Sequence, residues 1–263
     1  MSERRTRRHG RAPGRPSGHR APASRPAKAR RDPEIERILA ERVLWHDGLM
    51  LVLNKPAGLP VHRGPSGIPS VEDGLDALRF GLPARPGLAH RLDHDTSGCL
   101  VLGRHARALR RLGRLFQAGA VEKSYMAIVE GQPPDEGSIE HALAKRRHAS
   151  GWRMEIAADG QPAVTRFRTI GRSDGLALVE LTPLTGRTHQ IRIHLASLGA
   201  PVAGDPWYGR GGGPLQLHAR AVTIPLHPDR PPVRIVAPLP PHMHEAARCC
   251  GWHDDRGTGD CRG

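Results

Sequence analysis

The chain has 263 residues, 38% of them hydrophobic, which is enough to bury the core of one folded domain. The formal net charge of +14 favours a polyanionic partner, and residues 1–31 supply +10 of it through eleven Lys or Arg against one acid. No apolar stretch reaches the roughly 18 residues that a membrane helix needs, and four cysteines are too few for a disulfide framework. These features exclude membrane insertion and secretion, and we expect a monomer in the reducing cytoplasm.

The composition divides the chain into three expected segments. Residues 1–31 space Pro and Gly too closely for a helix or strand, so we expect a disordered basic tail that grips RNA phosphates or only aids solubility. Residues 32–246 contain no repeat or long linker and are expected to fold as one domain. Residues 247–263 are expected to form a disordered C-terminal tail.

Apolar periodicity predicts the main elements of this domain in chain order. Apolar runs predict strands over residues 49–54, 99–102, 121–129, 176–181 and 215–221. Apolar residues at helical spacing predict helices over 108–116, ended by Gly119, and over 188–198, ended by Gly199. Because strands and helices do not alternate regularly, the pattern favours an α+β domain with a mixed sheet.

Three polar segments interrupt the apolar elements. HRLDHDTSG, at residues 90–98, places acids, histidines and hydroxyls directly before a buried strand, a common position for catalysis, although DTSG alone is typical of a hydrogen-bonded turn. TGRTHQIRIH, at residues 185–194, passes through a glycine into a helix start, where backbone N–H groups and Arg187 suit a phosphate. The third segment is the 121–129 strand with Lys123 and Tyr125, where Tyr125 taken alone would be an ordinary core residue.

Residue spacing disfavours the common cofactor sites. His189 and His194 are five residues apart, which does not place two metal ligands on one helical face. No glycine-rich nucleotide or dinucleotide loop is present, so we expect neither a cofactor nor a metal. The Cys and His residues near the C-terminus match no regular zinc-ligand spacing either: His242, His244, Cys249, Cys250, His253 and Cys261.

Taken together, the polar segments resemble the signature motifs of the RluA-type pseudouridine synthases. The motifs occur in order: LNKPAGLPVH at 53–62, HRLDHDTSG at 90–98, EKSYMAIVEG at 122–131, LTPLTGRTHQIRIHLASLGAPVAGDPWYG at 181–209 and LHARAVTIPLHP at 217–228. The resemblance implies an α+β fold with a central mixed, largely antiparallel sheet flanked by helices. It also implies an enzyme that isomerises uridine to pseudouridine in structured RNA without a cofactor.

The resemblance implies roles for individual residues. Asp93 corresponds to the nucleophile, and Arg192 to an arginine that pairs with its carboxylate and keeps it ionised. Tyr125 corresponds to a tyrosine that packs on the target base, and Arg91 to an arginine that fills the gap left by the flipped base. Leu217 matches a hydrophobe near the base. Further RNA-contacting or supporting residues are expected to be His90, Lys55, Lys123, Arg187 and His189.

Several alternatives stay open. Ribosomal and transfer RNA are both plausible targets, and Lys55 alternatively caps a strand. Many relatives carry a small RNA-binding domain ahead of the catalytic one; too few residues precede the first motif for it, so the basic tail is expected to replace its charge. The chain is alternatively a noncatalytic RNA-binding or assembly protein on the same fold, or an RNA-cleaving enzyme that uses His90, His189 or His194 as acid and base.

Overall fold

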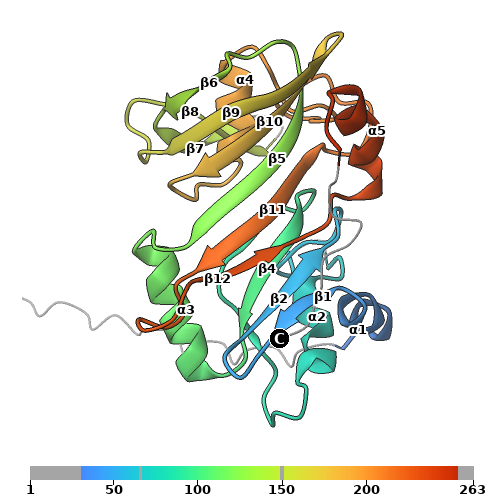
Figure 1. The fold of residues 1–263 in the computed structure, drawn as a ribbon, viewed down its shortest axis with the longest axis vertical. Helices are drawn as coiled ribbons and strands as arrows, with labels where there is room; N and C mark the ends of the chain where they lie inside the picture. Colours follow the sequence, from blue (N-terminus) through green and yellow to red (C-terminus); the bar gives the residue numbers. More distant parts are fainter. Residues whose placement is uncertain (1–30, 65–66, 149–150, 254–263) are drawn as a thin grey trace, which may run out of the picture.

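A ten-stranded mixed sheet forms the centre of the protein in the computed structural model, which describes residues 31–64, 67–148 and 151–253 (Figure 1). Its strands lie in the order β1 (Val43–His46), β2 (Met50–Lys55), β4 (Ser97–Gly103), β11 (Leu217–Ile224), β5 (Glu122–Glu130), β10 (Leu176–Pro183), β9 (Val164–Ser173) and β6 (Glu136–Glu140), with β3 (Gly87–Leu88) beside β4 and β12 (Val233–Val236) beside β11. A separate hairpin joins β7 (Leu143–His148) and β8 (Gly151–Ile156). Among the described strands every pairing is antiparallel except that of β4 with β11, which confirms the α+β fold with a mixed, largely antiparallel sheet.

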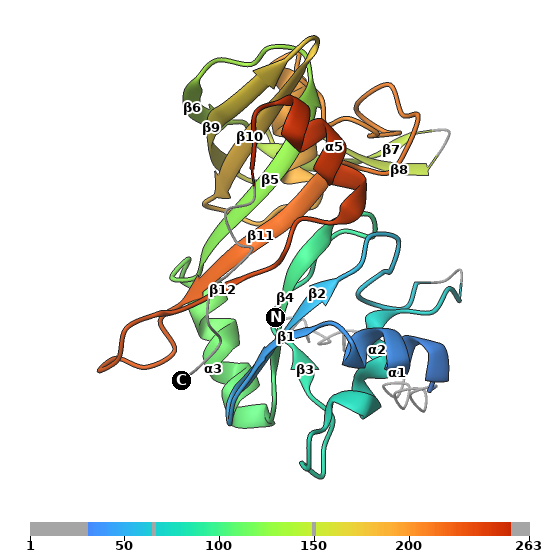
Figure 2. The ribbon, with the colours of Figure 1, turned by 45° about the vertical axis from the view of Figure 1, so that its right-hand side comes forward.

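Helices cover both faces of the sheet. Successive side chains of a strand point to opposite faces, so each face has its own set of core residues. They are α1 (Pro33–Ala40), α2 (Val71–Gly74), the short 3₁₀ helix η1 (Leu75–Leu78), α3 (Ala106–Gln117), α4 (Gln190–Ser197) and α5 (Pro241–Cys249). In β5, Ala127 and Val129 lie in one cluster with α4, whereas Met126 and Ile128 lie in another with α5. The side chains of β2 likewise pack alternately into the cluster with α1 and into the cluster with α3. Figure 2 shows α5 in front of β5, with α3 at the opposite end of the sheet.

The predicted elements are present with small shifts. The apolar runs form β2, β4, β5, β10 and β11, and the two predicted helices are α3 and α4, followed by Gly119 and Gly199 at positive φ. α4 starts two residues later than predicted, since His189 adopts the left-handed conformation at a φ of 55°. The sequence does not predict the remaining elements, most of which are short or bury few side chains: α1, α2, η1, α5, β1, β3, β6 to β9 and β12. No helix in the described ranges is long and apolar enough to cross a membrane.

The first described helix begins close to the expected start of the domain, and the last one runs past its expected end. Asp32 caps α1, and its carboxylate accepts hydrogen bonds from the backbone N–H groups of Glu34 and Ile35. At the other end α5 runs beyond the expected limit at residue 246, and both Ala247 and Cys250 are buried. The prediction of a tail that starts at residue 247 is therefore wrong. Residues 254–263 and the expected basic tail at 1–30 lie outside the described residues.

The parallel pairing of β4 with β11 depends on Gly98. A β-carbon at Gly98 would lie 2.2 Å from the carbonyl oxygen of Ala219, and Gly98 has a φ of +105°. We expect Gly98→Ala to lower the free energy of unfolding by about 2–5 kcal/mol, because it adds a backbone clash to a strained conformation. Urea denaturation measures the loss.

A glycine in α3 provides the control for this prediction. A β-carbon at Gly113 would meet nothing within 4 Å, so Gly113→Ala should leave stability unchanged or raise it, since alanine favours helices. Equal losses for Gly98→Ala and Gly113→Ala would contradict the special role of Gly98.

Candidate active site

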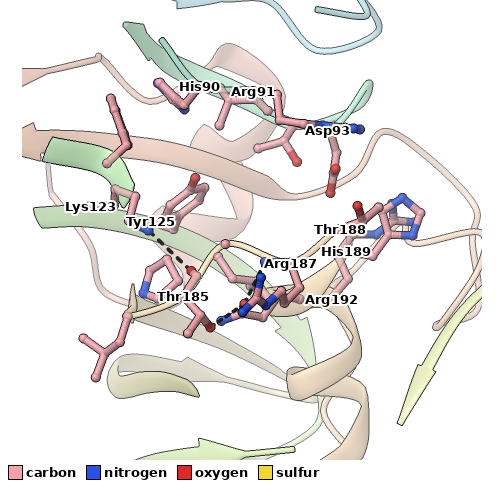
Figure 3. A pocket seen from close by; sticks show the side chains of 18 of the residues that line it. His90, Arg91, Asp93, Lys123, Tyr125, Thr185, Arg187, Thr188, His189 and Arg192 are labelled. Carbon is pink, nitrogen blue, oxygen red and sulfur yellow. Dashed lines mark hydrogen bonds between the residues drawn. The ribbon is translucent and has the colours of Figure 1, made fainter. Parts of the chain in front are cut away.

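A cleft of about 590 Å³ lies where the loop before β4, strand β5 and the loop before α4 meet (Figure 3). The order of the strands brings these parts together: β11 pairs with both β4 and β5, and β5 pairs with β10, whose end leads into the loop before α4. The volume falls within the range of small-molecule sites. All predicted site residues except Lys55 line the cleft: His90, Arg91, Asp93, Lys123, Tyr125, Arg187, His189, Arg192 and Leu217.

Asp93 is the single carboxylate among the described residues that line the cleft. Its backbone carbonyl accepts the N–H of Thr96 at 3.2 Å, which closes a turn directly before β4. Figure 3 shows its side chain pointing across the cleft toward Thr188 and His189. The cleft thus offers one carboxylate to a ligand, together with four basic side chains: Arg91, Lys123, Arg187 and Arg192.

Lys55 supports the Asp93 loop from behind and does not line the cleft. Its side chain is fully buried, and its Nζ donates hydrogen bonds of 2.8, 2.8 and 3.0 Å to the carbonyl oxygens of Pro56, Leu59 and His94. Burial lowers the pKa of Lys55 to about 7. The expectation that Lys55 contacts RNA is therefore wrong, because it has no exposed surface; its contacts agree with the alternative of a cap at the end of β2.

Two of the histidines considered for RNA cleavage are held in structural contacts. Nε2 of His90 accepts the N–H of Val101 at 2.9 Å, and its ring stacks on Phe116 at 4.5 Å. His194 is fully buried, lies outside the cleft, and shares a hydrogen bond of 2.9 Å with the hydroxyl of Thr165. Burial lowers the pKa of both rings to about 4, so both rings are neutral near pH 7.

Arg192 has a different partner from the one predicted. Its Nε and Nη2 donate to the two carboxylate oxygens of Asp205 at 2.7 and 2.6 Å, and both side chains are almost completely buried. Asp205 also accepts the backbone N–H groups of Trp207 and Tyr208. The prediction that Arg192 pairs directly with Asp93 is thus wrong in this structure. Although burial opposes it, Asp205 and, more weakly, the charge of Asp93 raise the pKa of Arg192.

Tyr208 joins this buried ion pair to its surroundings. Its hydroxyl lies 3.0 Å from Nδ1 of His189 and donates to the carbonyl oxygen of Met154 at 3.1 Å. Its ring lies close to the guanidinium groups of Arg192 and Arg153, at 5.3 and 4.9 Å. Sequence reasoning assigned no role to the aspartate and tyrosine of GDPWYG at 204–209, and the presence of this segment within a signature motif is the signal that could have found them.

Tyr125 lies where two core clusters meet beneath the cleft. It packs against the cluster under α1 and against the cluster under α4, which fixes the position of its ring. Burial and the charge of Asp93 both raise the pKa of the Tyr125 phenol, so it keeps its proton at neutral pH. Lys123 lies two residues earlier in β5; its Nζ donates to the carbonyl oxygen of Thr185 at 3.4 Å, and burial lowers its pKa.

The start of α4 is less open to a phosphate than predicted. The side-chain oxygen of Gln190 accepts the backbone N–H of Arg187 at 3.0 Å and the hydroxyl of Thr185 at 2.7 Å. Nε of Arg187 donates to the carbonyl oxygen of Pro162 at 3.2 Å. One expected backbone donor is therefore already used within the protein, while Arg187 still lines the cleft.

In the described part of the chain, no three His, Cys, Asp or Glu side chains come together as a metal site requires. Nε2 of His242 and Nε2 of His244 bond to backbone carbonyls at 3.3 and 2.7 Å, and Cys249 and Cys250 are free thiols. Cys261 lies outside that part of the chain.

Comparisons with known proteins place the chain in a family. Residues 49–197 match a family model described as RNA pseudouridylate synthase. An uncharacterized RNA pseudouridine synthase of Zymomonas mobilis is 43% identical over 210 residues, which cover 77% of this chain and 95% of the relative. The ribosomal large subunit pseudouridine synthase C of Escherichia coli is 38% identical over 224 residues, which cover 79% of this chain and 70% of the relative.

Some relatives are longer, and the chain spans 51% of an RNA pseudouridine synthase of Chloroflexus aurantiacus to which it is 44% identical over 162 residues. Among solved structures, human RNA pseudouridylate synthase domain containing 4 superposes with a TM-score of 0.70 and 27% identity, covering 83% of this chain and 96% of that one. The family match spans more than half of the chain, and its relatives share most of the fold. The chain therefore belongs to the RluA-type family of RNA pseudouridine synthases, which are isomerases.

Proposed function

We propose that the protein converts specific uridines of structured RNA to pseudouridine, with Asp93 as the nucleophile and without a cofactor. The observation that carries this proposal is the position of Asp93, which is the one carboxylate that the described residues place in a cleft of about 590 Å³ lined by basic side chains. A polyanionic substrate would enter such a cleft readily, and the carboxylate would then lie beside the flipped nucleotide.

The isomerisation breaks one bond of the nucleoside and forms another. The N1–C1′ bond breaks, the uracil turns within the cleft, and a C5–C1′ bond forms as the C5 proton leaves and N1 gains a proton. Asp93 begins the reaction by attack on C1′ of the ribose or on the uracil ring, and its bond to the substrate breaks again before the product leaves. Substrate and product have the same atoms, so no group or electron donor is needed.

The other lining residues hold the RNA and the detached base. Arg91 is exposed on the loop that carries Asp93, where it is placed to fill the gap left by the flipped nucleotide. Tyr125 offers its ring to the uracil, with Leu217 beside it. Arg192, fixed by Asp205, stabilises the negative charge that develops as the base detaches.

For the substrate we favour ribosomal RNA, with transfer RNA as the alternative. Relatives at 37–40% identity from Yersinia pestis, Haemophilus ducreyi and Escherichia coli are named ribosomal large subunit pseudouridine synthases, which supports this choice. The bacterial relatives support a cytoplasmic location.

Carbodiimide labelling, which maps pseudouridines in RNA, tests this function directly. Total RNA is compared between cells with and without the gene, and the gene is then restored as wild type or as Asp93→Ala. We expect one or a few uridines to lose their mark without the gene, and only the wild type to restore it. No change at any uridine would favour the noncatalytic RNA-binding alternative, and strand breaks would favour RNA cleavage.

A further inference from the structure

Four arginines form a single stripe along the solvent side of α3. Arg107, Arg110, Arg111 and Arg114 follow the spacing i, i+3, i+4 and i+7, which places them within an arc of about 100°. The opposite side of the helix, with Leu112 buried, packs against the sheet. Arg107, Arg110 and Arg114 are exposed, and Arg111 is half-buried.

The stability of α3 does not explain this stripe. The helix contains no acid, and none of these arginines makes an ion pair with a described residue. Like charges three and four residues apart repel each other and destabilise a helix. The surface of α1 shows the usual alternative, an i, i+4 ion pair between Arg37 and Glu41. A bound polyanion would relieve the repulsion that α3 carries.

The stripe leads directly to the cleft. Gln117 lies three residues after Arg114 and seven after Arg110, so it continues the same line along the helix. Gln117 and Gly119, just beyond the end of α3, line the cleft that holds Asp93. Figure 1 shows the end of α3 beside the start of β5, the strand that carries Lys123 and Tyr125.

We propose that the α3 stripe binds backbone phosphates of the RNA strand that leads into the cleft. The inference rests on the proposed function, because the cleft defines where the target nucleotide lies. Arginine suits this task, since its planar guanidinium donates two parallel hydrogen bonds to a phosphate. Such contacts carry no sequence information, so the stripe positions the RNA and other groups select the uridine.

Two double variants with the same change in charge test this surface. Arg110→Gln with Arg114→Gln removes the two arginines in line with Gln117. Arg166→Gln with Arg248→Gln is the control: both are exposed, one on β9 and one on α5, and neither lines the cleft. A fluorescent RNA hairpin with uridines in its loop serves as the binding probe, measured across a range of salt concentrations.

We expect the stripe variant to bind the hairpin roughly tenfold more weakly near 0.1 M salt, and to lower the slope of log affinity against log salt by about 1.5. The control should change affinity by about twofold at most, because screening limits distant charges. Circular dichroism should show that the stripe variant is folded and at least as thermostable as the wild type. Equal changes in both double variants, or no change in the stripe variant, would overturn the proposal.

A second measurement separates this proposal from the proposed function. The substrate is total RNA from cells without the gene, carrying tritium at C5 of uridine, which pseudouridine formation releases as water. For the stripe variant we expect the RNA concentration at half-maximal rate to rise roughly tenfold with the maximal rate unchanged. If the wild type releases no tritium, the proposed function fails while hairpin binding still decides the role of the stripe.

Discussion

Replacing Asp93 by asparagine is expected to abolish tritium release from C5-labelled RNA, with a loss of at least roughly 10⁴-fold, as the loss of a catalytic nucleophile does in other enzymes. Asparagine keeps the size of the side chain but cannot form the required bond to the substrate. No other carboxylate lines the cleft within the described residues, so none can take over the reaction. The rate measured with excess enzyme isolates the chemical step from RNA release.

The same substitution is expected to leave folding and RNA binding intact. The carboxylate of Asp93 makes no hydrogen bond or ion pair with any described residue, so stability should stay within about 0.5 kcal/mol of the wild type. Asp95→Asn is the matched control, because Asp95 lies two residues away in the same loop, pairs with His94 at 2.8 Å and does not line the cleft. Near-normal turnover by Asp93→Asn, or equal losses in both variants, would refute the nucleophile assignment.

Local pattern was sufficient to find the central strands, and the resemblance to the RluA-type motifs identified the residues of the cleft. The runs within β2 and β4 and the second half of β5 are apolar, because helices cover both faces of the sheet there. The cleft residues lie in short motifs at or near the ends of these elements, so recognising the motifs identified the residues as one group. The hairpin of β7 and β8 and the helix α5 were missed, because they bury few side chains and therefore lack a strong period.

Partners that lie far apart in the chain could not be read from the sequence. Lys55 was expected to contact RNA, but its ammonium group is buried and donates a hydrogen bond to the carbonyl oxygen of His94, 39 residues further along the chain. The resemblance paired Arg192 with Asp93, and only the fold shows that the segment after α4 brings Asp205 to it. The close approach of Gly98 to Ala219 likewise depends on the parallel pairing of strands. In each case tertiary contacts decide which partner a residue has, and the spacing of residues along the sequence does not reveal these contacts.

The buried pair of Arg192 with Asp205 leads to the second large effect. Asp205→Asn removes the charge that compensates Arg192, and both side chains are at most 3% exposed. Removing one partner of a buried ion pair costs about 3–5 kcal/mol of stability, which urea denaturation can measure. Turnover should also fall by about 100-fold or more at temperatures where the variant is folded, because Arg192 loses the contacts that hold it at the cleft.

The difference in the free energy of unfolding between the wild type and Asp205→Asn should depend on pH. Burial would raise the pKa of Asp205, but hydrogen bonds from Arg192 and from the backbone of Trp207 and Tyr208 outweigh it and lower the pKa below its usual range. A lowered pKa contributes stability that is present above about pH 4 and is lost as the pH falls through the folded-state value. The difference in free energy of unfolding between the wild type and Asp205→Asn should therefore become smaller below about pH 4.

A double variant separates the structural role of this pair from its role in the reaction. Arg192→Met combined with Asp205→Asn removes the uncompensated charge, so it should regain much of the stability that Asp205→Asn alone loses. Its turnover should stay low, because the guanidinium that stabilises charge at the cleft is gone. If the double variant recovers both stability and near-normal turnover, the pair serves only to hold the fold together, and Arg192 has no part in catalysis.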